Sequence, residues 1–229
     1  MYLYEMHQHT AGCSACGVAD PAGVVRQIRQ AGFAGVVLTN HFYHGNTGIR
    51  RNQPWEDFVM PYVEAYEIAR QEGERLDIDV LFGLEENIGD AKEVLLYGIT
   101  PEFVLSHPEL RDGGLANIAA LVHEAGGLVY QAHPYRVRDY IPRPWEDIPA
   151  QFLDGVEVYN ACNSPVEDAR ALLLAQREGL LRCAGSDAHT ECFEGRFGIA
   201  CAHRIRTEAE LAQVLRDGDH ELYTGTARP

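Results

Sequence analysis

The chain has 229 residues, with 34 acidic and 19 basic side chains and a formal net charge of −15. Domains usually contain about 100–200 residues, so we expect residues 1–229 to form a single domain with a full hydrophobic core. A chain this acidic is a poor binder of nucleic-acid backbones and of anionic membranes. A small phosphate compound would also be repelled, unless a metal ion supplies local positive charge.

Short apolar runs alternate along the chain with amphipathic stretches, which predicts alternating strands and helices. The predicted strands cover residues 2–6, 35–38, 78–84, 94–99, 128–131, 155–159, 181–184 and 221–223. The predicted helices cover residues 21–32, 54–72, 115–125, 165–178 and 207–216. Asp20 and Thr207 are typical N-caps, and Gly179 is typical of a helix end.

This repetition predicts an α/β fold with a parallel sheet. About seven strand–helix units without a central break favour a closed barrel over an open sheet. The longest irregular stretches, residues 42–53, 135–147 and 189–198, follow polar strand ends. Because an α/β barrel places its active site at that edge, we expect the functional side chains there.

The cysteines and the N-terminus indicate the compartment. Six cysteines are too few for a scaffold built on disulfides. The first residues lack the features of a secretory signal, and no apolar run reaches the about 18 residues of a membrane span. We therefore expect a cytoplasmic protein with reduced thiols. Cys13 and Cys16 have the C-x-x-C spacing of half a zinc site or a redox pair, and their role stays open.

Histidines and carboxylates gather at the predicted strand ends. His7 and His9 are two residues apart, as are Asp187 and His189, so each pair can point to one face of its strand. The other strand ends carry His41, Glu85, His133 and Asn160. Imidazole and carboxylate ligands together suit Zn, Mn or Fe, which predicts a metal site. His44 follows His41 in a long loop and is a further candidate.

These residues form an ordered set of motifs. In chain order the motifs are His7-Gln8-His9, Thr39-Asn40-His41, Gly83-Leu84-Glu85, Ala132-His133-Pro134, Glu157-Val158-Tyr159-Asn160 and Gly185-Ser186-Asp187-Ala188-His189. The set resembles the PHP (polymerase and histidinol phosphatase) superfamily over about residues 5–195. The resemblance implies a distorted, TIM-barrel-like (β/α)7 barrel, a two- or three-metal site and metal-dependent phosphoester hydrolysis, as in a stand-alone histidinol-phosphatase-like enzyme.

The chain departs from this family at three places. Asn40 stands where members commonly have Asp, and Cys16 lies in a loop where many have an acidic residue or His. Residues 90–97 contain no His, although many members have a further ligand there. The departures predict a reduced ligand set, in which Cys16 replaces a ligand or a third metal binds weakly.

We expect each proposed ligand to have a distinct role. One ion is held by His7, His9, Glu85 and Asp187. Glu85 also bridges to a second ion shared with His133, while His41 and His189 hold a third ion or orient the substrate. Arg136 is expected to bind phosphate oxygens as charge develops on them. His189 or His44 protonates the leaving oxygen, and Asn160 supports the site.

The sequence is compatible with three functions. The first is a phosphoesterase acting on a small phosphorylated metabolite through metal-activated water. The second is another metal hydrolase, for instance one that cleaves a C–N bond, and the third is a non-catalytic metal-binding or regulatory protein. The net charge of −15 disfavours a nuclease. The sequence predicts neither the substrate nor the oligomeric state.

Overall fold

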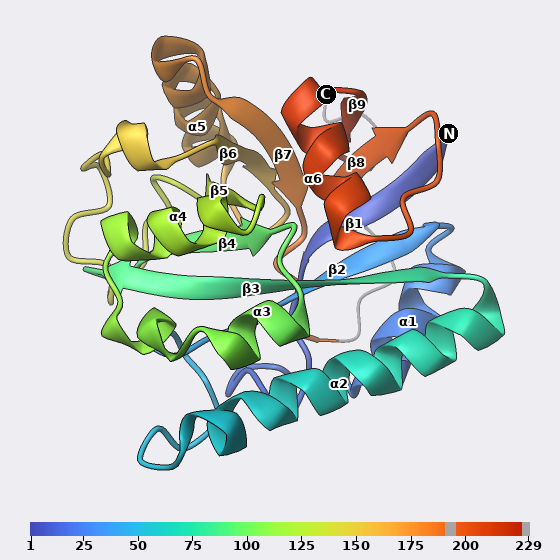
Figure 1. Cartoon of the computed structure of the whole chain (residues 1–229). Helices are drawn as coiled ribbons and strands as arrows, with labels where there is room; N and C mark the ends of the chain where they lie inside the picture. The colour runs from blue at the N-terminus through green and yellow to red at the C-terminus, as the bar shows by residue number, and fades with distance from the viewer. Residues whose placement is uncertain (191–195, 226–229) are drawn as a thin grey trace.

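A curved sheet of nine strands forms the centre of the structure, a computed structural model that describes residues 1–190 and 196–225 (Figure 1). The strands are β1 (Tyr2–Gln8), β2 (Gly35–His41), β3 (Asp79–Gly89), β4 (Lys92–Tyr97), β5 (Leu128–Gln131), β6 (Gly155–Asn160), β7 (Leu181–Gly185), β8 (Gly198–Cys201) and β9 (His220–Tyr223). Their order in the sheet is β7-β6-β5-β4-β3-β2-β1-β8-β9. A bridge between Gln8 and Ala188 joins the ends of β1 and β7, which nearly closes the sheet into a barrel.

The α/β barrel-like fold predicted from the sequence is confirmed, but the all-parallel sheet of about seven strands is wrong. β4 pairs antiparallel with both β3 and β5, and β8 pairs antiparallel with β1 and β9. The cause lies in the short β3–β4 connection, where Asp90 and Ala91 both have positive φ angles of 52° and 53°. Such a two-residue turn makes a hairpin, because a parallel crossover needs a much longer segment.

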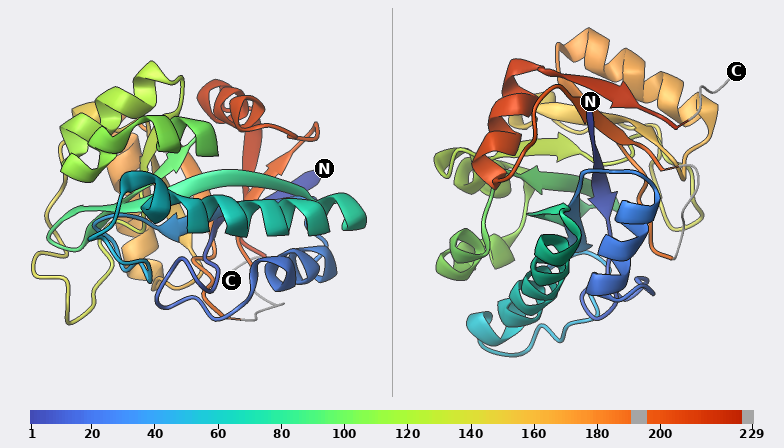
Figure 2. Two further views of the ribbon diagram at one scale, coloured as in Figure 1. Left: turned by 60° about the horizontal axis from the view of Figure 1, so that its bottom comes forward. Right: turned by 90° about the vertical axis from the view of Figure 1, so that its right-hand side faces the viewer.

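Helices lie around the outside of the curved sheet (Figure 2). They are α1 (Pro21–Gln30), α2 (Trp55–Leu76), α3 (Pro101–Ser106), α4 (Leu115–Glu124), α5 (Pro165–Glu178) and α6 (Glu208–Asp217), with short 3-10 helices at Pro108–Asp112 and Ala150–Phe152. The predicted N-caps are confirmed, since the side chains of Asp20 and Thr207 accept hydrogen bonds from backbone N–H groups of α1 and α6. Within the described residues, every helix is too short or too polar to cross a membrane.

Apolar and polar side chains occupy successive levels of the same sheet face. Val37, Leu81 and Leu95 are completely buried and pack in one cluster. Because side chains alternate along a strand, residues two or four positions further share that face. His41, Glu85 and Glu93 occupy those positions on β2, β3 and β4. The apolar level therefore supports a polar level at one end of the barrel.

The sequence missed several elements. The sequence analysis predicts no helix at α3 and no strand at β8, although Thr100 and Pro101 form a typical helix start. β8 falls at the end of the stretch 189–198, of which residues 191–195, including Cys192, lie outside the described part of the chain. The stretches 42–53 and 135–147 are irregular, as predicted.

Candidate metal centre

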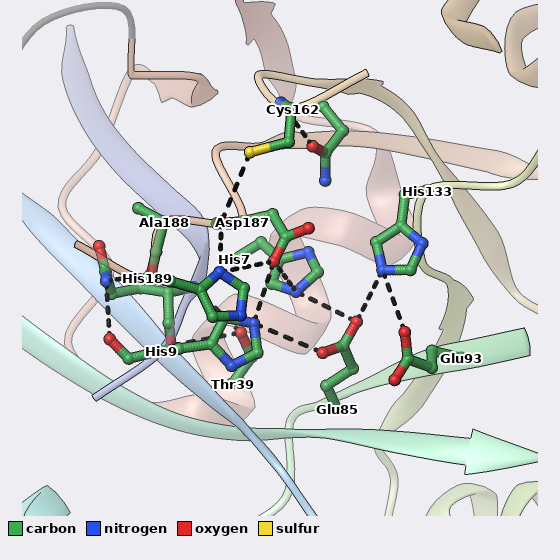
Figure 3. Close-up of polar contacts among 12 residues, drawn as sticks. His7, His9, Thr39, Glu85, Glu93, His133, Cys162, Asp187, Ala188 and His189 are labelled. Atoms are coloured by element: carbon green, nitrogen blue, oxygen red, sulfur yellow. Dashed lines mark hydrogen bonds and ion pairs between the residues drawn. The ribbon is translucent and has the colours of Figure 1, made fainter. Parts of the chain in front are cut away.

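The polar level of the barrel is built around the carboxylate of Glu85 (Figure 3). Its Oε1 lies 2.9 Å from His133 Nε2 and 3.3 Å from His7 Nε2. Its Oε2 lies 2.8 Å from His41 Nδ1 and 3.4 Å from His9 Nε2. Four imidazoles from three different segments therefore converge on one completely buried carboxylate.

Asp187 closes the other side of this cluster. Its Oδ1 lies 3.1 Å from His9 Nε2 and 3.5 Å from His7 Nε2. Asp187 and His133 both follow strand ends and have positive φ angles, of 54° and 26°. Non-glycine residues adopt such angles at a cost of roughly 1–3 kcal/mol each, typically where a functional site fixes them. These turns direct both side chains into the barrel end.

A buried carboxylate determines which nitrogen of His7 faces the cluster. Glu157 Oε1 lies 3.0 Å from His7 Nδ1, and a carboxylate can only accept, so Nδ1 carries the proton. In the neutral imidazole, the form that can bind a metal, the Nε2 lone pair therefore points towards Glu85 and Asp187. A carboxylate that orients an imidazole in this way is common around metal ligands. A register shift in β6 between Glu157 and Tyr159 lets Glu157 and Asn160 both face the site.

In the same way, the Ser14 hydroxyl determines which nitrogen of His9 faces the cluster. The Ser14 hydroxyl donates to Asn40 Oδ1 at 3.0 Å and accepts from the backbone N–H of His41 at 3.0 Å. Its remaining lone pair accepts the Nδ1–H of His9 at 3.0 Å. His9 Nε2 is thus left as a lone pair aimed at the cluster. Asn40 faces the loop after β1 and also accepts from the backbone N–H of Thr10, so it fixes that loop.

The donor atoms are arranged as metal ligands would be. His7 Nε2, His41 Nδ1 and Glu85 Oε2 are buried and have no hydrogen-bond partner among the described residues. Groups of donors within 4.8 Å of one another are His9-His41-His189, His7-His9-Glu85, His7-His133-Asp187 and His41-Glu85-Glu93. The groups overlap and mix imidazole with carboxylate, which fits divalent ions such as Zn, Mn or Fe. All seven ligands predicted from the sequence lie in these groups.

Glu93 is a candidate ligand that sequence reasoning missed. It is at the start of β4 and directs its two oxygens to His41 Nδ1 at 3.5 Å and His133 Nε2 at 3.4 Å. Residues 90–97 contain no His, and the expected site residues stand at strand ends, whereas an antiparallel strand brings its start to the site. The sequence feature that could have indicated Glu93 is a carboxylate directly after a hairpin turn. Glu157 is part of one of the sequence motifs, but the motif does not indicate its contact with His7.

Without metal, the pKa values of the cluster side chains are shifted by burial and by the charges of their neighbours. Burial lowers the pKa of His9 to about 3, which leaves it neutral. Burial would also lower the pKa of His41, but the charge of Glu85 raises it to about 11. Burial would raise the pKa of Glu85, yet His41 and His7 hold it well below its ordinary value. Burial and the charge of Glu85 raise the pKa of Glu93 to about 8. Without metal, protons thus balance part of the negative charge.

A cavity of about 560 Å³ opens beside the cluster. It is lined by cluster residues His41, Glu93, His133, Asp187 and His189, and further by Cys16, His44, Gly45, Asn46, Asn87, Ala91, Arg136 and Tyr140. The volume is that of a pocket for a small molecule. Burial would raise the pKa of the Cys16 thiol, but hydrogen bonds from His189 and His41 lower it to about 6.

Arg136 lies at the base of this cavity. It donates to Asp187 Oδ2 at 2.5 Å, to Asn160 Oδ1 at 2.8 Å and to Asn163 Oδ1 at 3.0 Å. A guanidinium has five N–H groups, so two remain for which the described residues offer no acceptor. Arg196 is buried against Glu5 and Gln8 and is not among the residues that line this cavity.

Comparison with known proteins agrees with this fold. A family model described as PHP-associated matches residues 167–220. The chain resembles a two-domain protein from Bacteroides vulgatus ATCC 8482 that contains a predicted PHP-like metal-dependent phosphoesterase, with a TM-score of 0.71 and 15% identity. The match covers 98% of this chain and 65% of that chain, so this chain spans less than two thirds of that protein's length.

Two further solved structures share the fold. A candidate metal-dependent phosphoesterase from Bifidobacterium adolescentis ATCC 15703 has a TM-score of 0.59 and 16% identity, with 93% of this chain and 95% of that chain covered. An amidohydrolase from Chromobacterium violaceum has a TM-score of 0.55 and 19% identity, with 81% and 87% covered. A search of curated proteins gave no significant match.

A nearly closed α/β barrel with imidazole and carboxylate groups converging at one end defines the class of this protein. The family-model match and the shared fold agree with the motifs found in the sequence. The chain is therefore similar to PHP proteins in its motifs, in the match of residues 167–220 to the PHP-associated family model and in its fold.

Proposed function

We propose that the chain is a metal-dependent hydrolase that cleaves a phosphate ester of a small molecule. One observation carries this proposal: overlapping donor groups, with three buried atoms that lack hydrogen-bond partners among the described residues, lie beside a cavity lined by Arg136. The description of two structural neighbours as metal-dependent phosphoesterases supports it. The cavity volume of about 560 Å³ supports a small substrate.

The cluster offers ligands for two or three divalent ions, with Zn, Mn or Fe the best fit to its donors. The proposed ligands are His7, His9, His41, Glu85, Glu93, His133, Asp187 and His189. When bound, such ions lower the pKa of a coordinated water and neutralise charge on phosphate oxygens. Glu85 is central because its two oxygens serve different donor groups.

Two residues of the chain have the geometry to assist the cleavage. Arg136 has two N–H groups left to donate to phosphate oxygens as their charge grows. His44 lines the cavity, and its hydrogen bond to Glu86 raises its pKa, so it can hold a proton for the leaving oxygen. His189, the alternative proton donor, has its Nδ1 2.9 Å from the carbonyl oxygen of Asp187. That contact leaves His189 Nε2 as a lone pair and suits a ligand better.

The test is hydrolysis of p-nitrophenyl phosphate and bis(p-nitrophenyl) phosphate by metal-loaded protein. We expect turnover that a chelator abolishes and that His7→Ala removes. His203→Ala, at an exposed position outside the cluster, is the matched control and should retain turnover. If the metal-loaded protein hydrolyses neither ester, or if His7→Ala is as active as the control variant, the proposal is wrong.

A hydrolase of C–N bonds is the second candidate function. The likeness to the Chromobacterium violaceum amidohydrolase favours it. Hydrolysis of p-nitroanilides without hydrolysis of the phosphate esters would identify this alternative. Stoichiometric metal binding without turnover of either class would instead indicate a binding or regulatory protein.

A further inference from the structure

Glu86 is a buried carboxylate outside the donor groups described above. It follows Glu85 in β3, so its side chain faces away from the cluster and towards the loop of residues 42–53. Its Oε1 accepts from the backbone N–H groups of His44 at 2.8 Å and of Asn87 at 2.7 Å. Its Oε2 is buried and has no hydrogen-bond partner among the described residues. Backbone groups therefore compensate the charge of this carboxylate only in part.

The imidazole of His44 is the group placed to compensate this charge. His44 Nδ1 lies 3.7 Å from Glu86 Oε1, within the range of an ion pair, and such contacts are often long before substrate binds. The contact with Glu86 raises the pKa of His44, while burial and the charge of Arg51 oppose this change. Glu86 is 1% exposed, whereas the His44 side chain is 39% exposed and lines the cavity. The pair thus joins a buried carboxylate to an imidazole that a bound molecule can reach.

The ring of His44 is held in place by its neighbours. The guanidinium of Arg51 donates to the carbonyl oxygens of Tyr43 and Gly45, the residues on either side of His44. Gly113 packs against the ring, since a Cβ there would lie 2.7 Å from His44 Cε1. The ring of Tyr43 makes an edge contact, with the two ring centroids 5.1 Å apart. Because Nδ1 is directed at the buried carboxylate, Nε2 is the nitrogen left to donate to a molecule in the cavity.

We propose that Glu86 is a positioning residue that holds His44 as the proton donor to the leaving oxygen, and that the substrates are phosphate esters of aliphatic alcohols. This inference rests on the proposed phosphoesterase function and names its substrate class. During hydrolysis a water oxygen bonds to phosphorus, the bond from phosphorus to the ester oxygen breaks, and the electron pair of that bond stays on the ester oxygen. This oxygen takes the proton of His44 Nε2 and leaves as a neutral alcohol. The proton lost by the attacking water passes to solvent, and the imidazole regains a proton from solvent.

The basicity of the leaving group determines whether this proton is needed. An alkoxide is a strong base, so it leaves slowly unless a proton reaches its oxygen while the bond breaks. p-Nitrophenolate is a weak base and leaves without a proton. An imidazole held by a buried carboxylate beside the cavity therefore serves esters of aliphatic alcohols and contributes little to the cleavage of p-nitrophenyl esters.

The test compares kcat on glycerol 2-phosphate with kcat on p-nitrophenyl phosphate for the metal-loaded full chain. His44→Ala should lower kcat on glycerol 2-phosphate about 100-fold, the contribution of a general acid, and should lower kcat on p-nitrophenyl phosphate by a factor about tenfold smaller. Glu86→Gln should lower the ratio of the two kcat values about tenfold. Added to His44→Ala, it should cause no further loss, because Glu86 acts through His44. His203→Ala and Glu124→Gln, both at exposed positions, are the matched controls and should keep the wild-type ratio.

A further variant keeps the test decisive if Glu86→Gln does not fold. Gly113→Ala would displace the His44 ring without removing an ionisable group, so it should lower the same ratio. Equal losses on the two esters in His44→Ala overturn the inference while the proposed function stands. A further loss when Glu86→Gln is added to His44→Ala, or hydrolysis of p-nitrophenyl esters alone, has the same consequence. If the protein hydrolyses neither glycerol 2-phosphate nor any p-nitrophenyl phosphate ester, both the inference and the proposed function are wrong.

Discussion

Replacing Glu157 by Gln tests whether the orientation of His7 depends on the carboxylate behind it. Three buried donors share this carboxylate: His7 Nδ1 at 3.0 Å, the His133 backbone N–H at 2.8 Å and Asn160 Nδ2 at 2.9 Å. Glutamine has the same size but only one acceptor oxygen and one NH₂ group. If the NH₂ group faces His7, the proton of that imidazole moves to Nε2, the atom directed at the cluster. If it faces the other two donors, both lose their acceptor.

The expected magnitude follows from the lost interaction. A hydrogen bond to a charged group contributes about 1.5–3 kcal/mol, and an orphaned buried donor costs a similar amount. A residue that orients a metal ligand typically contributes about 10- to 100-fold in metal affinity, which corresponds to the same energy range. For a chain of this size 1 kcal/mol shifts the melting temperature by about 2–4 °C. Glu157→Gln should therefore lower zinc affinity by about 10- to 100-fold and the melting temperature by about 3–12 °C.

Zinc affinity is measured by titrating metal-stripped protein against a chromophoric chelator, and stability by thermal unfolding of the same samples. Glu124→Gln, exposed at the end of α4, is the matched control and should change neither quantity. If Glu157→Gln binds zinc as tightly as wild type, the reasoning about the His7 tautomer is refuted. A lower melting temperature with unchanged zinc affinity would show that Glu157 contributes to stability and not to metal binding.

Three further predictions concern the same cluster. Because the pKa of Glu93 is raised from 4.5 to about 8, the folded metal-free protein binds a proton that the unfolded chain has lost between these pH values. Its stability in urea should therefore fall as pH rises through that window, and this fall should be smaller in Glu93→Gln. Gly185→Ala would place a Cβ 2.5 Å from both Glu157 Oε1 and His7 Cβ, so zinc binding and melting temperature should both decrease. Arg136→Lys loses the forked donor geometry and some of its three buried hydrogen bonds, so we expect kcat on p-nitrophenyl phosphate to fall about 100-fold and the melting temperature to decrease as well.

The sequence predicted those proposed ligands whose positions follow from the two-residue periodicity of side chains along a strand. In H-x-H and D-x-H the two-residue spacing puts both side chains on one face of the chain, and the structure brings His7, His9, Asp187 and His189 together. The same period explains Asn40. It precedes a cluster residue in β2, so its side chain faces the opposite side and binds the loop after β1. Asn40, which stands where family members commonly have Asp, therefore affects the loop that supports the site more directly than it affects the proposed metal ligands.

The residues that the sequence missed depend on chain direction and on loop conformation. The prediction that functional side chains lie at strand ends holds for parallel strands. The two-residue turn at Asp90 and Ala91 reverses β4, so the start of that strand, with Glu93, reaches the cluster. Ser14 lies in a loop without any period, and its hydrogen bonds with the Asn40 side chain and the His41 backbone join segments far apart in the chain. No local pattern encodes such a contact.

Some of the acidic residues that contribute to the net charge of −15 also belong to the site that is proposed to bind a phosphate ester. The carboxylates of Glu85, Glu93, Glu157 and Asp187 surround the polar level, where Arg136 is the guanidinium at the cavity. Without metal, the raised pKa values of His41 and Glu93 keep protons in the cluster, and these protons offset part of the negative charge. Divalent ions that displaced the protons would add more positive charge at the same atoms, so they would change the sign of the local field where the rest of the surface stays acidic. A small phosphate can then be attracted to the cavity alone, whereas a long polyanion would still meet the acidic surface around it.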